Sequence, residues 1–133
     1  MSVEWKKRSK LHDELVDRVA LMLGPSFVYV REAHFAGRRV DLLATCGRFR
    51  IGFEIKASRS NFLAEVRHQT WKHAEVRMAC TEFYFVLPEA VLVKHRFDML
   101  KFVPKDCGLI MVPTVGDPEI MIRCKTHCPT AET

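Results

Sequence analysis

The amino-acid sequence predicts an α/β domain with a mixed sheet, and three observations support this fold class. An amphipathic helical pattern opens the chain, three strand patterns follow it, and a second helical pattern precedes a strongly apolar strand. Such alternation of helix and strand periods is typical of α/β domains. With 133 residues the chain has the length of about one domain. We therefore expect residues 1–133 to form a single domain.

The first expected element is a helix, and a short strand follows it. Leu11, Leu15 and Val19 recur on one face at helical spacing, and Gly24-Pro25 is a helix-terminating pair. Residues 27–30, with the sequence Phe-Val-Tyr-Val, are then expected to form a strand.

A β-hairpin is expected next, with strands over 40–45 and 50–56. Apolar and polar residues alternate in both segments, which is the pattern of half-buried strands. Gly47 supplies the backbone geometry that a tight turn needs. If Gly47-Arg48 form the loop, Asp41 lies opposite Glu54, and Arg39 lies opposite Lys56.

The same register sorts the hairpin side chains onto two faces. The core face would then hold six apolar residues, namely Val40, Leu42 and Ala44 across from Ile55, Phe53 and Ile51. The two acids would meet on the other face, because opposed residues have Cβ atoms about 5 Å apart. A slip by one residue would spoil both arrangements, so the sequence pattern favours this register.

A long helix and a buried strand are expected after the hairpin. The helix runs from Ser60, as its N-cap, to near Cys80, with a weak apolar stripe in its middle. Residues 83–87 are strongly apolar and form a strand that ends at Pro88.

The last part of the chain is expected to contain two short strands. Residues 108–112 and 119–123 form this pair around the turn residues 116–118. The segment around Lys94-His95-Arg96 is expected to be a connection, and residues 124–133 a loose polar tail.

Composition and charge favour a cytoplasmic protein with an anionic partner. The formal charge is +5, and basic residues cluster at 6–10 and at Arg38-Arg39, as suits binding to a polyanion. No apolar run reaches the roughly 20 residues that span a bilayer, and the N-terminus lacks the apolar stretch of a signal peptide. Five cysteines, an odd number, favour reduced thiols over a secreted disulfide framework.

Asp41, Glu54 and Lys56 form the candidate catalytic site. Charges in core-like strands are costly to bury unless they are paired or bind a metal. Two opposed carboxylates can share one Mg²⁺, for which Mn²⁺ is a substitute, and the Ile55 carbonyl is a further candidate ligand. A water on the ion can attack a phosphodiester, while Lys56 orients that water or neutralises charge on the phosphate. An acid-x-Lys pattern alone is a very weak motif, and taken alone it is more typical of a surface hairpin with cross-strand ion pairs.

These residues carry a family resemblance. The pattern Gly-Arg-Arg-Val-Asp41, followed by Glu54-Ile-Lys56-Ala-Ser-Arg-Ser-Asn-Phe, resembles the PD-(D/E)XK nuclease superfamily, in particular its MmcB-like DNA-repair group and phage-associated relatives. The resemblance extends from about Arg31 to Arg123. It implies a restriction-endonuclease-like αβββαβ core, a mixed sheet flanked by helices, a divalent metal at Asp41 and Glu54, and Lys56 as the catalytic lysine.

The resemblance also has departures and open positions. Val40 stands where relatives often carry Pro, Asn61 where they often carry Asp, and Val76 where they often carry Tyr. These changes leave the expected metal site intact but put the role of the second helix in substrate handling in doubt. Glu14 on the first helix is an additional candidate carboxylate, and Glu32 is another; a plain surface acid is the alternative for both.

Five residues are candidates for contacts with nucleic acid, namely Arg38, Arg39, Ser58, Arg59 and Lys72. Ser58 could equally cap a turn, and Lys72 could simply solvate its helix. The expected function is a Mg²⁺-dependent DNA endonuclease in repair, recombination or phage DNA processing. The resemblance leaves a homodimer and repair or phage protein partners open.

Three alternatives remain beside this interpretation. The first is a non-cleaving nucleic-acid-binding module on the same fold, and the second is an RNA nuclease. The third concerns Cys124, His127 and Cys128, whose thiols and imidazole fall within five residues and suggest zinc. Structural zinc usually needs a second pair of ligands, and free cysteines in the tail are the simpler interpretation.

Overall fold

The computed structural model describes residues 10–68 and 74–126. Its elements, in chain order, are α1 (Lys10–Met22), β1 (Val28–Phe35), β2 (Arg38–Cys46), β3 (Phe49–Ile55), α2 (Arg59–His68), α3 (Ala74–Ala79), β4 (Glu82–Pro88), α4 (Glu89–Lys101), β5 (Gly108–Val112) and β6 (Glu119–Ile122). The strands form one six-stranded sheet in the order β1 to β6. Pairs β3–β4 and β4–β5 are parallel and the other three are antiparallel, so the predicted mixed sheet is confirmed.

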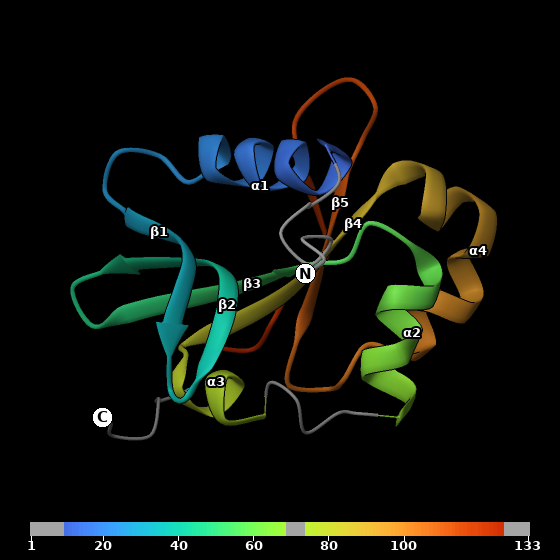
Figure 1. Ribbon diagram of the computed structural model, residues 1–133. Helices are drawn as coiled ribbons and strands as arrows, with labels where there is room; N and C mark the ends of the chain where they lie inside the picture. The colour runs from blue at the N-terminus through green and yellow to red at the C-terminus, as the bar shows by residue number, and fades with distance from the viewer. Residues whose placement is uncertain (1–9, 69–73, 127–133) are drawn as a thin grey trace, which may run out of the picture.

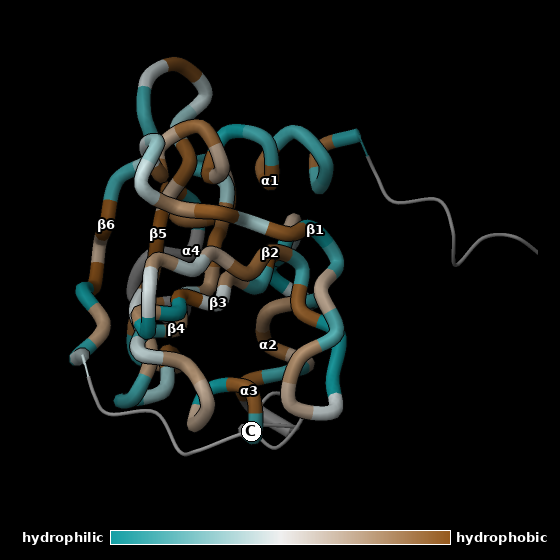
Figure 2. The backbone as a smooth tube through the Cα atoms, turned by 90° about the vertical axis from the view of Figure 1, so that its left-hand side faces the viewer, coloured by the Kyte–Doolittle hydropathy of each residue, from teal (hydrophilic) through white to brown (hydrophobic). Residues whose placement is uncertain are grey.

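Helices cover both faces of this sheet (Figure 1). α1 packs on one face through Leu15, Val16 and Val19. α2, α3 and α4 pack on the other face, through residues that include Phe62 and Val76. In Figure 2 the strands in the middle are largely brown, with α1 above them and α2 and α3 below. The parallel crossovers explain this arrangement, because right-handed connections that step the same way along a sheet place their helices on one face.

The first helix ends where the sequence predicts, whereas β1 extends beyond the strand predicted over 27–30 to a turn that was not predicted. α1 ends just before Gly24, whose φ of +76° lies in the left-handed region that favours glycine. The β1–β2 turn consists of Ala36 and Gly37, with φ values of +54° and +82°. Two residues with positive φ match the right-handed twist of the flanking strands, which fixes this hairpin tightly.

The register predicted for the β2–β3 hairpin is confirmed between Leu42, opposite Phe53, and Cys46, opposite Phe49. The prediction of half-buried strands is wrong. Leu43 is buried on the face covered by α2 to α4, while Leu42 is buried on the α1 face. A strand flanked by helices on both sides is apolar in both directions, so alternation did not mark a solvent face here.

The second half of the chain departs further from the predictions. The expected single helix over 60–80 is wrong: α2 and α3 are separate helices that lie in different places below the sheet (Figure 1). The segment expected to be a connection around 94–96 is helix α4, whose mixed polar and apolar residues concealed its period. The predicted strand pair is confirmed as β5 and β6. No helix in the described parts of the chain is long and apolar enough to cross a membrane.

The expected loose tail is also corrected at its start. Cys124 is buried, and its Sγ accepts the N–H of Phe83 at 3.4 Å and donates to the carbonyl of Asp106 at 3.3 Å. Thr126 donates its hydroxyl to Glu82 at 2.6 Å. Backbone and side-chain hydrogen bonds therefore attach residues 124–126 to β4, and residues 127–133 lie outside the described part.

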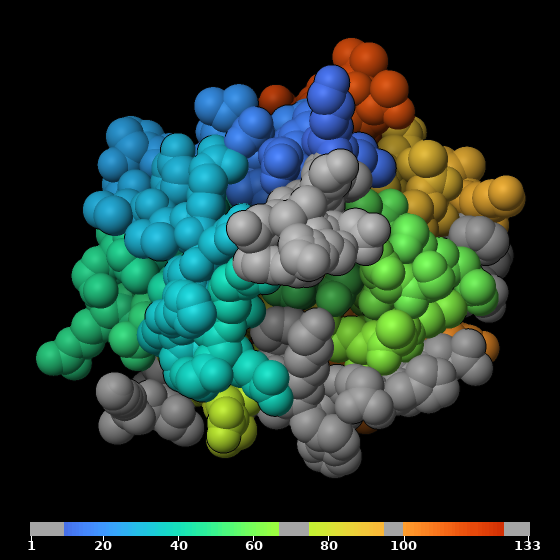
Figure 3. All heavy atoms as spheres, in the orientation of Figure 1, coloured from blue at the N-terminus to red at the C-terminus, as the bar shows by residue number. Residues whose placement is uncertain are grey.

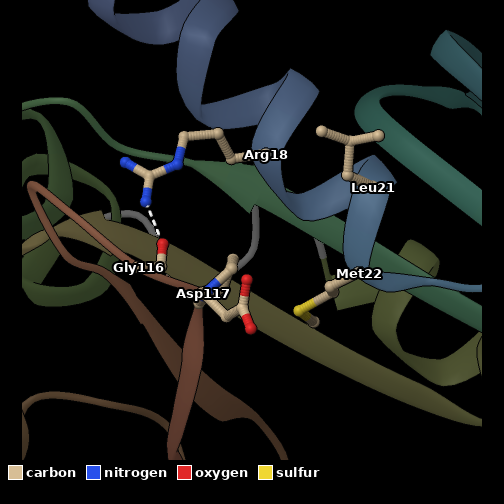
Figure 4. Close-up of a pocket in the computed structure, with 6 residues that line it drawn as sticks. Arg18, Leu21, Met22, Gly116 and Asp117 are labelled. Atoms are coloured by element: carbon tan, nitrogen blue, oxygen red, sulfur yellow. Dashed lines mark hydrogen bonds between the residues drawn. The ribbon is translucent and has the colours of Figure 1, made fainter.

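Arg18 ties α1 to the loop between β5 and β6. Its guanidinium donates to the carbonyl of Pro113 at 2.6 Å and to that of Gly116, and Figure 4 shows the second bond. The same residue lines a hollow of about 330 Å³ with Leu21, Met22 and Asp117. This contact connects α1 to the loop that follows β5.

Candidate active site

Asp41 lies where the β2–β3 ladder ends. The last backbone pair on this side is Leu42 with Phe53. One residue further along, the Asp41 carboxylate itself accepts the backbone N–H of Ile55, with 2.8 Å between Oδ2 and N. The side chain therefore takes the place of a strand carbonyl, and this hydrogen bond compensates part of the cost of burying a carboxylate.

Strands β1 and β2 are both irregular next to Asp41. In the β1–β2 ladder, Arg31 pairs with Leu42 and Ala33 with Val40, and Glu32 between them has a φ of +50°. Val40 packs into the cluster under α2 to α4, whereas we expected it beside Leu42 on the other face. The predicted pairs Asp41–Glu54 and Arg39–Lys56 are thus not part of the backbone ladder, because β2 changes face at Asp41.

Glu54 and Lys56 lie at the end of β3, and Glu65 on α2 is a second acid beside Lys56. The Lys56 Nζ lies 3.5 Å from Oε2 of Glu54 and 2.8 Å from Oε1 of Glu65. All of these residues are nearly inaccessible, with relative exposures of 7% for Asp41 and Glu54, 8% for Lys56 and 3% for Glu65. In Figure 3 the end of β3 (dark green) lies deep between β2 (cyan) and α2 (bright green).

The surrounding acids keep Lys56 charged. Burial by itself lowers the pKa of a lysine, but here the carboxylates of Glu54, Glu65 and Asp41 outweigh it and raise the pKa above its ordinary value of 10.5. Lys56 is therefore an ammonium ion at neutral pH. It can donate hydrogen bonds and neutralise negative charge, and it cannot act as a base there.

Helix α1 reaches the site through a histidine. The His12 Nε2 lies 3.4 Å from Oδ2 of Asp41, the same oxygen that accepts the Ile55 N–H. The His12 side chain is 14% exposed. α1 and α2 thus approach the hairpin residues from opposite faces of the sheet.

Neither His12 nor Glu65 was predicted from the sequence. Glu65 follows Phe62 by three residues, and His12 precedes Leu15 by three, so each shares a helix face with a buried residue. A polar residue inside an apolar stripe was the available signal. It became informative only once the helices were known to pack beside Asp41 and Lys56.

The described residues that were predicted to contact nucleic acid lie on β2 and at the start of α2. Arg38 and Arg39 are exposed on β2, near the turn of the β1–β2 hairpin, and the Arg39 Nη1 lies 3.6 Å from Oε1 of Glu32. Ser58 caps α2, because its Oγ accepts the N–H of Asn61 at 3.2 Å. The predicted N-cap, Ser60, is instead the second residue of that helix, directly after the half-buried Arg59.

Other candidates lie elsewhere. Glu14 is exposed and lines a separate hollow of about 320 Å³ between α1 and the start of α4. Glu32 is exposed on β1 and forms the ion pair with Arg39. Lys72, His127 and Cys128 lie outside the described residues.

The carboxylates at this site suit some metal ions and not others. Within residues 10–68 and 74–126, no group of three or more His, Cys, Asp or Glu side chains is arranged as a metal site. Zn²⁺ needs three or four such ligands and does not fit. Mg²⁺ is usually held by one or two carboxylates and keeps several waters, so Asp41 and Glu54 fit this ion.

Comparisons with known proteins establish the fold and nothing about activity. No protein-family model matches the chain, and no curated protein matches it either. A solved structure from Silicibacter pomeroyi, of a protein of unknown function, is similar with a TM-score of 0.66 and 20% identity, over 93% of this chain and 78% of that chain. SfsA from Pyrococcus furiosus, solved in complex with Ca²⁺, gives a TM-score of 0.36 and 10% identity, over 86% and 62%. A TM-score that low does not establish a shared fold.

Proposed function

We propose that this protein is a metal-dependent DNA endonuclease that hydrolyses phosphodiester bonds, in DNA repair, recombination or phage DNA processing. The observation that carries the proposal is a cluster of three buried carboxylates around one buried ammonium at the end of the hairpin. The resemblance of Asp41, Glu54 and Lys56 to the PD-(D/E)XK pattern gives the reaction class.

The charge of the cluster favours a divalent cation. Asp41, Glu54 and Glu65 carry three negative charges and Lys56 carries one positive charge, so these four side chains have a net charge of −2. Excess charge of one sign is costly at such low exposure. A divalent cation beside Asp41 and Glu54 would balance it, which is why the arrangement suits Mg²⁺ better than a purely structural ion pair.

Each residue then has a role that follows from its position. Asp41 and Glu54 hold the cation, with the Ile55 carbonyl as a candidate third oxygen. The cation, when bound, lowers the pKa of a coordinated water and offsets charge on the phosphate. Lys56 donates hydrogen bonds to the attacking water or to a phosphate oxygen, and Glu65 holds that ammonium in place at 2.8 Å.

The basic hairpin supplies the expected contact with DNA. Arg38 and Arg39 are exposed on the strand that carries Asp41, two and three residues away from it. The two-residue turn at Ala36 and Gly37, with positive φ at both positions, joins this strand to β1. Together with the formal charge of +5, these exposed arginines support a polyanionic substrate.

Cleavage assays test the proposal. The pure protein is incubated with branched, nicked and single-stranded DNA and with paired RNA substrates, in Mg²⁺ or Mn²⁺. We expect cleavage of DNA that stops in EDTA. Asp41→Asn, Glu54→Gln and Lys56→Met should each lower kcat by about 100-fold or more, because each removes a charge that acts on the reacting phosphate. Glu119→Gln, at an exposed acid on β6, is the matched control and should leave the rate unchanged.

A specific observation supports a second candidate, the non-cleaving nucleic-acid-binding module. Lys56 already forms ion pairs with two of the acids, Glu54 and Glu65, as a purely structural cluster would. This candidate predicts salt-sensitive DNA binding that is unchanged by Asp41→Asn, with no Mg²⁺ or Mn²⁺ bound at millimolar concentration. Metal-independent cleavage, or cleavage that survives Asp41→Asn, would falsify the endonuclease proposal.

A further inference from the structure

His12 provides a contact between α1 and Asp41 that the proposed roles do not use. Its Nε2 lies 3.4 Å from Oδ2 of Asp41, and the Ile55 N–H donates to that same oxygen at 2.8 Å. One carboxylate oxygen thus faces two nitrogen atoms from two different elements, α1 and β3. Side-chain rotation of Asp41 would disrupt both contacts at once.

We propose that His12 is a positioning residue, which orients the Asp41 carboxylate toward a divalent cation. This inference rests on the proposed function. The imidazole donates through Nε2–H to Oδ2, and the other oxygen, Oδ1, is the one we assign to the cation. Catalytic contacts of 3.4 Å are common before ligands bind and shorten in the loaded state.

A histidine suits this position better than another charged residue. A lysine would add a positive charge that competes with the cation, and a carboxylate would add to a cluster that already has three acids. The imidazole N–H fixes the orientation of the carboxylate and adds no further acid to the cluster. Groups that hydrogen-bond to metal ligands in this way commonly change metal affinity by about 10- to 100-fold.

The position of His12 on α1 also explains how the helix takes part. The Glu14 carboxylate, which the sequence offered as a ligand from this helix, lines a different hollow beside α4. His12 lies on the side of α1 that faces the sheet, three residues before the buried Leu15. α1 therefore contributes orientation to the site and no ligand.

Calorimetric titration of the full chain with Mn²⁺ alone tests this inference without any measurement of cleavage. His12→Leu keeps apolar bulk but removes the donor, and it should raise the Kd for Mn²⁺ about 10- to 100-fold. His12→Gln places an amide N–H near the position of Nε2 and should restore most of the affinity. His34→Leu, at an exposed histidine on β1, is the matched control and should bind as the wild type does.

The outcomes separate this inference from the proposed function. Unchanged Mn²⁺ affinity in His12→Leu would show that His12 only fills space. Equal losses in His12→Leu and His12→Gln would show that an N–H donor at this position does not restore the affinity, which also overturns the inference. A wild-type protein that binds no Mn²⁺ would overturn the proposed function, and the inference with it. Circular dichroism melts of every variant establish that each one is folded before its affinity is compared.

Discussion

Lys56 is the residue on which the charge balance of the site depends. Its ammonium lies within 3.5 Å of Glu54 and 2.8 Å of Glu65, and both acids are buried. The Coulomb attraction in such a cluster offsets the cost of removing each charge from water. Removal of the one cation leaves the acids to repel each other at low exposure. Loss of Lys56 alone should therefore destabilise the fold more than its presence stabilises it.

The substitution Lys56→Met should lower the free energy of unfolding by about 3–5 kcal/mol, the usual cost of breaking a buried ion pair from one side. Mg²⁺ should recover part of this loss, because a cation that binds only the folded state stabilises it. Urea denaturation with and without Mg²⁺ measures both effects. Lys105→Met, at an exposed lysine, is the control and should have little effect. Equal stability of Lys56→Met and wild type would contradict the buried-cluster description.

At the scale of single elements, the hairpin could be predicted from sequence and the helices only in part. The turn at Gly47 and the alternation of side chains fixed the pairing from Leu42–Phe53 to Cys46–Phe49 correctly. The end of the ladder at Asp41 could not be predicted, because a side chain replaces the backbone acceptor there. α4 was missed since its apolar positions show little helical period, and the break between α2 and α3 carries no Pro or Gly.

The start of α2 can be tested with two serines. Ser58→Ala should destabilise the protein by about 1 kcal/mol, because its Oγ accepts the N–H of Asn61 at the helix N-terminus. Ser58→Asp keeps an acceptor and should retain most of the stability. Ser60→Ala should change the urea midpoint by far less, since Ser60 is exposed inside the first turn. A larger loss of stability in Ser60→Ala than in Ser58→Ala would show that Ser60, and not Ser58, is the N-cap.

At the scale of the whole molecule, the α/β class and the mixed sheet followed from the order of periodic segments. The burial of both faces of the sheet could not be predicted from this order, because it depends on which face each crossover helix covers. The same packing buries three thiols, those of Cys80, Cys107 and Cys124. Burial raises the pKa of each thiol, to about 12 for Cys80. It also raises the pKa of Tyr84 to about 12.

These raised pKa values predict loss of stability in alkali. A buried thiol that stays protonated in the folded state but ionises near pH 9 when unfolded contributes stability below pH 9. That contribution falls as the pH rises from about 9 toward 12. Urea denaturation at pH 7.5, 9, 10 and 11 should show a steady fall above pH 9, and Cys80→Ala should make the fall less steep. A flat profile up to pH 11 would contradict the burial of these groups.

The most direct measurement of the central claim is a crystal structure of the protein soaked in Mn²⁺, with anomalous scattering used to locate the ion. We predict one strong peak between the carboxylates of Asp41 and Glu54, with Lys56 beside it. Crystals of Asp41→Asn, soaked in the same way, should lose the peak. Absence of manganese at these carboxylates in the wild type, or a peak only at another part of the surface, would contradict the assignment of a metal-dependent nuclease site.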